Sequence, residues 1–257
     1  MSEALPAIAT WQAGAVLLAG VAAGFVNTLA GGGSLVSLPA LLLLGLPANL
    51  ANATNRVAVL LQSASATAEF ARAGRLELSA GAAVAAPALL GALAGASAAA
   101  VMPEPALRNV LIAAMLAIAG LLLVRPAVLA PPPGTRARRL RERPHVGFVL
   151  FLVGAYGGFV QAGVGLFLLA SLSGLLRYDL VRANAIKALV ISGFTALSLV
   201  VFIAAGQVLW APGLLLSLGM VAGARLGVRF ALERGHEALR RVVLAMAVAT
   251  CIAAWLR

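Results

Sequence analysis

Two polar clusters interrupt apolar stretches of this 257-residue chain, and their residue types are suited to holding an anion. The first is Asn27-Thr28-Leu29-Ala30-Gly31-Gly32-Gly33-Ser34, whose three glycines favour a break in the backbone. The apolar segment that follows, Leu35–Leu46, has 12 residues. As a helix it would be about 18 Å long, whereas a hydrocarbon core is about 30 Å thick. We therefore expect a half-helix, shortened by Pro39 and capped by Ser34, whose free N–H groups and positive dipole end attract an anion. A turn or a close helix contact is the alternative interpretation.

The second cluster combines a polar run with a lysine in the other half of the chain. Asn52, Thr54, Asn55 and Arg56 lie where an apolar helix is expected to begin, so their side chains and its N–H groups should converge. Lys187 is the only lysine, against 18 arginines, which indicates a position that needs a compact ammonium. We expect it to contact the anion. The alternative is a lysine that reaches the membrane interface.

The two halves of the chain repeat one another. Gly24–Val26 recurs at Gly158–Val160 and Gly31 at Gly165, both 134 positions later. Asn52 recurs at Asn184, 132 positions later, and this offset also holds for Phe70/Phe202, Gly74/Gly206, Gly91/Gly223 and Gly95/Gly227. We predict a first membrane repeat over 1–125, a basic linker over 126–145 and a second membrane repeat over 146–257. The candidate substrate-binding residues of the two copies are Asn27, Gly31, Gly32, Gly33, Ser34, Asn52, Thr54, Asn55, Arg56, Gln161, Gly163, Gly165, Asn184 and Lys187.

The elements that position these residues must be membrane helices. Hydrophobic residues make up 62% of the chain and charged residues 11%, which excludes a soluble enzyme, a disordered chain and a disulfide scaffold. We predict an all-α polytopic protein with 8–10 membrane segments, some broken or re-entrant, and an uncleaved first helix. The expected segments are 13–30, 34–46, 56–71, 79–101, 107–125, 146–162, 164–176, 188–205, 210–231 and 239–256. The net charge of +11 is assigned to cytoplasmic loops rather than to nucleic-acid binding.

The charges of matching loops predict the orientation of the copies. The loop at 72–77 has Arg72 and Arg75, whereas its counterpart at 205–211 is uncharged. The loop at 102–106 has only Glu104, whereas its counterpart is rich in arginine: Arg229, Arg234, Arg240 and Arg241. By the positive-inside rule the copies are inverted, with both termini outside and the linker cytoplasmic. Inverted repeats are typical of secondary transporters.

Other motifs are expected to be structural. Gly91 and Gly95, and Gly219, Gly223 and Gly227, have the spacing of close helix contacts, within the fold or between two copies in a homodimer. Glu69 and Arg72 should form an ion pair, and Cys251 should be a packing residue. No cluster of histidine, cysteine and acidic residues suits a metal, and no nucleophile motif occurs. We predict no enzyme activity, no cofactor and no metal site.

Three segments resemble the TauE/SafE family of sulfite exporters: Ala30–Leu60, with AGGGSLVSLPALLLLGLPANLANATNRVAVL, Arg182–Trp210 and Gly219–Gly235. The resemblance implies a bacterial inner-membrane transporter for sulfite, sulfonates or related small sulfur anions. It implies site positions at Gly31, Gly32, Gly33, Pro39, Asn52, Asn55, Gly165, Asn184 and Lys187. The second glycine cluster, Gly163-Val164-Gly165, is thinner than the first, so the two halves need not act symmetrically.

These observations together predict an exporter of a small sulfur oxyanion in the lipid bilayer. A negative cell interior drives an anion outward without a coupled ion. The alternatives are an importer or exchanger of organic anions, which a proton or sodium gradient would drive, and a membrane scaffold that recruits a partner through its basic linker.

Overall fold

A computed structural model describes the backbone of residues 10–124 and 137–255 and the side chains of residues 11–118 and 137–233. Within these ranges every regular element is helical. In chain order they are α1 (Thr10–Leu29), α2 (Ser34–Leu43), α3 (Ala48–Arg72), α4 (Leu78–Val101), α5 (Glu104–Val124), η2 (Leu140–Glu142), α6 (Pro144–Phe159), α7 (Val164–Leu169), η3 (Ala170–Leu175), α8 (Leu180–Ala204) and α9 (Trp210–Trp255). The predicted all-α class is confirmed.

Four of the described helices are long and apolar enough to cross a membrane: Trp11–Leu29, Leu78–Val101, Leu180–Ala204 and Trp210–Glu233. Three apolar helical segments are shorter: Ser34–Leu43, Pro144–Phe159 and Val164–Leu175. The chain is therefore a multi-pass membrane protein. The ten residues of α2 span about 15 Å, which confirms the expected half-helix after the glycine triplet.

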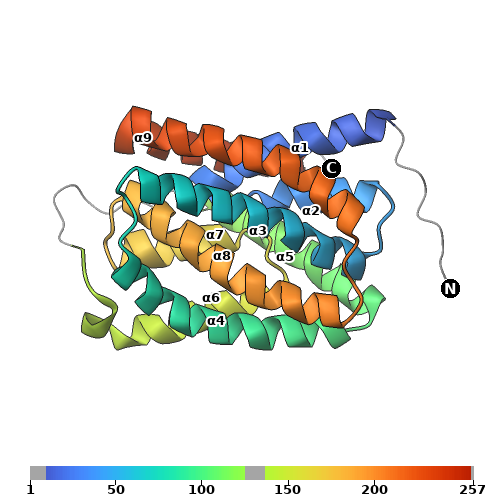
Figure 1. The fold of residues 1–257 in the computed structure, drawn as a ribbon, viewed down its shortest axis with the longest axis horizontal. Helices are drawn as coiled ribbons and strands as arrows, with labels where there is room; N and C mark the ends of the chain where they lie inside the picture. The colour runs from blue at the N-terminus through green and yellow to red at the C-terminus, as the bar shows by residue number, and fades with distance from the viewer. Residues whose placement is uncertain (1–9, 125–136, 256–257) are drawn as a thin grey trace.

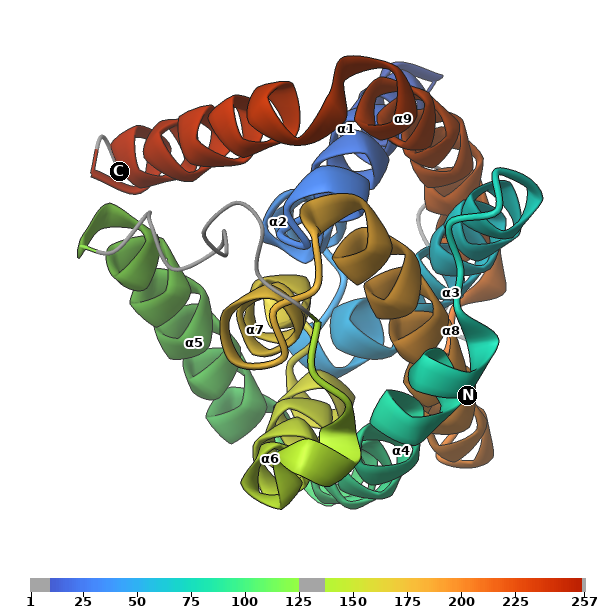
Figure 2. The same cartoon turned by 90° about the vertical axis from the view of Figure 1, so that its left-hand side faces the viewer.

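Two helix breaks lie in the middle of the bundle. The first separates α1 from α2 at residues 30–33, and the second separates α6 from α7 at residues 160–163. Gly31 and Gly163 turn the chain with φ of 81° and 68°, a conformation that a side chain makes costly. Viewed end-on, α2 and α7 lie inside a ring formed by the longer helices (Figure 2). The short helices that follow the two breaks thus lie inside the bundle.

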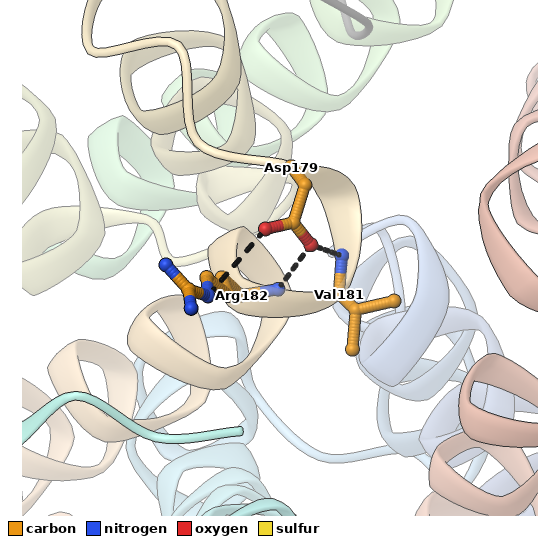
Figure 3. A network of polar contacts seen from close by, with 3 residues as sticks. All are labelled: Asp179, Val181 and Arg182. Atoms are coloured by element: carbon orange, nitrogen blue, oxygen red, sulfur yellow. Dashed lines mark hydrogen bonds and ion pairs between the residues drawn. The ribbon is translucent and has the colours of Figure 1, made fainter. Parts of the chain in front are cut away.

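The expected helix starts were wrong in two places. Helix α3 begins at Ala48 and α8 at Leu180, each about two turns before the segment that hydropathy marks, so Asn52–Arg56 and Lys187 lie inside helices. The N–H groups of residues 52–55 therefore bond within α3 and do not form an open helix end. At α8 the N-cap is Asp179, whose carboxylate accepts from the N–H groups of Val181 (3.1 Å) and Arg182 (3.0 Å), as Figure 3 shows. Hydropathy misses these first turns because they contain polar residues. Such residues can still be helical when their backbone N–H and C=O groups are hydrogen-bonded within the helix.

The expected helix cap at Ser34 was also wrong. Gly33 is the N-cap of α2 and Ser34 is its first residue. The hydroxyl of Ser34 instead accepts a hydrogen bond from Asn55 Nδ2 of α3, at 3.3 Å. A tertiary contact has replaced the local one, which ties the half-helix to α3.

Glycines let two pairs of helices approach closely, along opposite edges of the bundle (Figure 1). On one edge α1 packs against α9, and on the other α4 packs against α6. A Cβ atom at any of eight facing glycines would lie within 3 Å of backbone in the partner helix: Gly20, Gly24, Gly219, Gly223, Gly91, Gly95, Gly154 and Gly158. Gly227 of α9 similarly faces Thr28 of α1. The predicted close contacts are therefore confirmed, and they lie within the fold.

Replacing Gly154 with leucine should destabilise the protein by about 1–3 kcal/mol or more, because a side chain there collides with the backbone of Ala88 in α4. The matched control is Gly147→Leu on the same helix, since a Cβ at Gly147 meets no atom within 4 Å. The difference in stability is measured by thermal unfolding of the purified variants, with size-exclusion chromatography to detect the loss of folded protein. Equal stability of the two variants would contradict the assigned contact.

The packing of the helices follows the predicted repeat. The offsets match α1 with α6, α3 with α8, and α4 with the first part of α9. Helix α1 packs on α9 and its counterpart α6 packs on α4, so each copy contributes to both edges. Gly31 also lies directly against its repeat partner Gly165, as residues on a two-fold axis do. The division into 1–125, 126–145 and 146–257 remains a prediction.

The chain end differs from the expected pattern. The segments predicted at 210–231 and 239–256 form one helix, α9, of 46 residues, and Figure 2 shows its ribbon changing direction before the C-terminus. The side chains of Cys251 and of the arginines at 234, 240 and 241 lie outside the described residues, as does most of the linker.

Candidate functional site

Arg56 is a completely buried cation that joins α3 to the end of α6. Its Nη1 donates to the carbonyl of Gly157 (3.0 Å) and to Gln161 Oε1 (2.8 Å). Its Nη2 donates to the carbonyls of Gly158 (2.5 Å) and Phe159 (3.3 Å). These acceptors form the last turn of α6 and the break that follows it. The guanidinium carbon also lies 4.7 Å from the centre of the Phe202 ring of α8, within the range of a cation–π contact.

Lys187 has the same role in the opposite direction, from α8 to the end of α1. Its Nζ donates to the carbonyls of Asn27 (2.8 Å) and Thr28 (2.9 Å) in the last turn of α1, and to Asn184 Oδ1 (2.6 Å). The side chain is 2% exposed. An ammonium has three donors, so all of them are in use in this conformation. The alternative of a lysine that reaches the membrane interface is thereby excluded.

Each of the two cations bonds to the opposite half of the chain: Arg56 to the second half and Lys187 to the first. Each fastens the C-terminal end of the other half's interrupted helix, where the helix dipole is equivalent to about half a negative charge. Within the described residues the ion pairs are Glu69–Arg72, Asp179–Arg182 and Glu233–Arg229, all with substantially exposed side chains. Carbonyl dipoles thus offset only part of the charge of Arg56 and Lys187. Among the described residues, no carboxylate balances either of these two buried cations.

One side chain and two backbone carbonyls at the first break accept hydrogen bonds from N–H groups that the sequence suggested would be free. Asn27 Oδ1 accepts from the N–H of Gly33 (3.4 Å), and the N–H groups of Leu35 and Val36 bond to the carbonyls of Gly32 and Gly33. The N–H groups of Gly33, Leu35 and Val36 are therefore bonded in this conformation, and anion binding at this helix start stays a prediction. Asn27 of α1 accepts from one of these N–H groups, and backbone carbonyls of the break accept from the other two.

Around the second break, Gln161 holds the chain in a strained conformation. Its φ is 65°, in the left-handed region that a side chain enters at a cost of about 1–3 kcal/mol. Both ends of its amide are bonded: Oε1 accepts from Arg56, and Nε2 donates to Thr195 Oγ1 at 3.0 Å. Gly163 is the N-cap of α7, and Gly165 lies against Gly31. Strain of this kind persists where the surrounding contacts fix it, as they do at functional sites.

The asparagines position the broken helices. Asn55 Oδ1 accepts from Ser37 Oγ at 2.6 Å, so together with the contact to Ser34 it fixes α2. Asn52 Nδ2 donates to the carbonyl of Phe159 at 2.9 Å, beside the acceptors of Arg56. Asn184 accepts from Lys187. These three residues belong to the centre that the sequence predicted.

Thr54 lies apart from this centre, whereas Gly32 lies in the first break without a close helix contact. Thr54 Oγ1 accepts from the N–H of Leu209 at 3.0 Å, where α3 meets the start of α9. Gly32 faces the side chains of Leu35 and Val26, and a Cβ there would make ordinary contacts. Their positions give Thr54 a packing role and assign no particular role to Gly32.

Several residues of the centre were not predicted from the sequence. Gln62 accepts from Asn27 Nδ2 (2.6 Å) and donates to Thr28 Oγ1 (3.1 Å), which links α3 to the end of α1. The signal was present, because Gln62 lies seven residues after Asn55 and so two turns along one helix face. The other residues of this kind are Ser37, Thr195 and Phe202.

Some buried polar atoms of the centre have no hydrogen-bond partner: Arg56 Nε, Asn52 Oδ1 and Asn184 Nδ2. A small cavity beside Lys187, lined also by Asn27, Thr28 and Gln62, leaves about 10 Å³ for the centre of a water molecule. That is room for about one water. The centre thus has spare donors in a closed arrangement.

Helices interrupted in the middle of a membrane bundle, with buried polar and charged side chains at the breaks, define a class of membrane transporter. The chain belongs to the sulfite exporter TauE/SafE family, whose model matches residues 16–254. It is 31% identical to the probable membrane transporter protein ORF9 of a Sinorhizobium species, over 92% of this chain and 90% of that one. It is 31% identical to the probable membrane transporter protein YfcA of Escherichia coli K12, over 90% and 85% of the two chains. A probable membrane transporter protein of Haemophilus influenzae is 27% identical over 88% of each chain. No solved structure matches. The protein is thus a membrane transporter.

Proposed function

We propose that this transporter exports sulfite or a related small sulfur oxyanion across the bacterial inner membrane, with its linker in the cytoplasm. The anion passes between the two halves, where the breaks at Gly31–Gly33 and Gln161–Gly165 meet. The residues that serve it are Arg56 and Lys187 for charge, and Asn27, Asn52, Asn55, Asn184 and Gln161 for hydrogen bonding and for holding the broken helices. The family to which the chain belongs supports the choice of sulfite.

The observation that carries the proposal is the pair of buried cations. A charged side chain inside a membrane protein is costly, and such residues face a partner or a transport path. Arg56 and Lys187 are bonded to carbonyl and amide oxygens, and no carboxylate of the described residues pairs with them. A small anion between the halves would lower the energy of both charges, and Arg56 Nε and Asn184 Nδ2 have donor capacity for it.

Transport requires the closed centre to open. The cavity beside Lys187 admits about one water, and the three donors of this lysine are occupied, so an incoming anion must displace carbonyl partners. Because each cation fastens the opposite half, that displacement loosens the contact between the halves. We propose that alternating access follows from this competition between the anion and the helix ends.

Efflux of sulfite should depend on membrane potential. At 100 mV, a monoanion is driven outward by about 2.3 kcal/mol, which corresponds to a concentration ratio of roughly 50-fold. The measurement is sulfite flux from proteoliposomes at an imposed potassium diffusion potential, with thiosulfate, sulfoacetate, taurine and acetate as competitors. Sulfite flux that does not change with the potential but changes with a proton or sodium gradient would instead indicate an importer or exchanger.

A linker variant separates transport from scaffolding. Replacing Arg139 and Arg141 with glutamine removes charge from an exposed part of the linker far from the buried cations in sequence. A transporter should retain sulfite flux in this variant, since neither residue belongs to the centre. Loss of function here, with full function after Lys187→Met, would favour a scaffold.

A further inference from the structure

A groove of about 510 Å³ lies between α3 and α9, and neither Arg56 nor Lys187 lines it. Its lining includes Ser65, Glu69 and Arg72 of α3 with Ser217, Val221 and Arg225 of α9. The two helices run in the same direction, because the start of α9 at Leu209 and Gly213 meets Thr54 near the start of α3. Arg72 and Arg225 therefore lie at the same end of the groove.

The charges in the groove do not balance. Glu69 Oε1 lies 3.2 Å from Arg72 Nη1, which confirms the ion pair predicted from sequence. Arg225 is exposed and lies within the candidate membrane span Trp210–Glu233, yet no described carboxylate pairs with it. One positive charge therefore remains on a surface whose other end is apolar, at Leu61 and Leu218.

The repeat shows that packing does not require these polar groups. At the matching positions of α8 and α4 the repeat has Leu197 in place of Ser65, Val201 in place of Glu69, Ala204 in place of Arg72 and Leu93 in place of Arg225, all 132 positions apart. Helices α4 and α8 nevertheless pack closely. These polar residues are thus present on only one of two equivalent surfaces of the repeat.

We propose that this groove binds an anionic phospholipid, whose phosphate lies at Arg225 and Arg72 and whose acyl chain follows the apolar end. Arginine pairs with phosphate through two hydrogen bonds, and an uncompensated cation beside an apolar channel complements an anionic headgroup joined to a hydrocarbon chain. The proposal is independent of the transported anion. It assigns the groove a lipid that stabilises the contact between α3 and α9.

The test is lipid retention by the purified protein, measured by native mass spectrometry in mixtures of phosphatidylglycerol and phosphatidylcholine. The protein should retain phosphatidylglycerol in preference. Arg225→Gln and Arg72→Gln should each lower its affinity by about fivefold. Arg225→Lys keeps the charge and should retain most of the binding.

The matched control is Arg75→Gln, which removes the same charge from an exposed residue three positions after Arg72 but outside the groove. It should change lipid affinity by less than about twofold. An equal loss in Arg75→Gln, or no preference for phosphatidylglycerol, would overturn the proposal. Displacement of the lipid by glycerol 3-phosphate alone would do so too, because it would show a free-phosphate site. Thermal unfolding in lipid-free detergent identifies variants that fail to fold.

Discussion

Lys187→Met should lower anion flux by about 100-fold or more in proteoliposomes. The change removes one of two buried charges and leaves the carbonyls of Asn27 and Thr28 and the Asn184 amide oxygen without their donor. Breaking a buried charged contact costs about 3–5 kcal/mol, which corresponds to a factor above 100 when the contact acts in transport. Flux per correctly folded molecule, at several sulfite concentrations, is the measurement.

The control for this prediction is Arg182→Gln. Arg182 is a cation on the same helix, but it is exposed and pairs with Asp179 at 3.7 Å. It should retain flux within about twofold, because an exposed pair contributes little. Sulfite flux in Lys187→Met that equals flux in Arg182→Gln would remove the lysine from the proposed path.

Arg56→Met should strongly destabilise the folded protein. It leaves the carbonyls of Gly157, Gly158 and Phe159 and the amide oxygen of Gln161 without their guanidinium donor. It also removes the contact with Phe202. We expect a loss of about 3–5 kcal/mol, seen as a fall in unfolding temperature of roughly 10 °C, together with loss of flux. Thermal unfolding of the purified variant and sulfite flux in proteoliposomes are the two measurements.

Arg56→Lys tests whether the positive charge of Arg56 is sufficient or the planar shape of its guanidinium is also needed. A lysine keeps the positive charge but has three donors without the planar fork, so it cannot reproduce bonds to four acceptors. We expect intermediate stability and measurable flux. Full stability in Arg56→Met would show that the carbonyls find other donors and that Arg56 does not hold the two halves together.

Local patterns in the sequence predicted much of the fold. A glycine triplet before a largely apolar segment of 12 residues predicted the break before α2, since so short a helix cannot span a membrane. Glycines spaced by four residues predicted close helix contacts, because only backbone geometry is needed to recognise them. The ion pair of Glu69 and Arg72 followed from helical spacing alone.

The sequence placed the starts of α3 and α8 too late, so polar residues inside these helices were expected at helix ends. Hydropathy treats Asn52, Asn55 and Asn184 as signs of a helix end, although each lies inside a helix whose backbone is bonded. Gln62 was overlooked for a related reason, since its partners Asn27 and Thr28 lie more than 30 positions away. Polar groups inside a bundle are explained by tertiary partners rather than by their neighbours in the chain.

The sequence alone determined that this protein is a helical membrane transporter with interrupted helices, an internal repeat in its residue pattern, and two site candidates in Arg56 and Lys187. Composition, helix length and motif spacing are local properties, so a single chain displays them. Only the tertiary structure decided that each cation binds the helix end of the opposite half, and that Gly31 meets Gly165. Those contacts join residues 100 to 160 positions apart, and they depend on how whole helices pack.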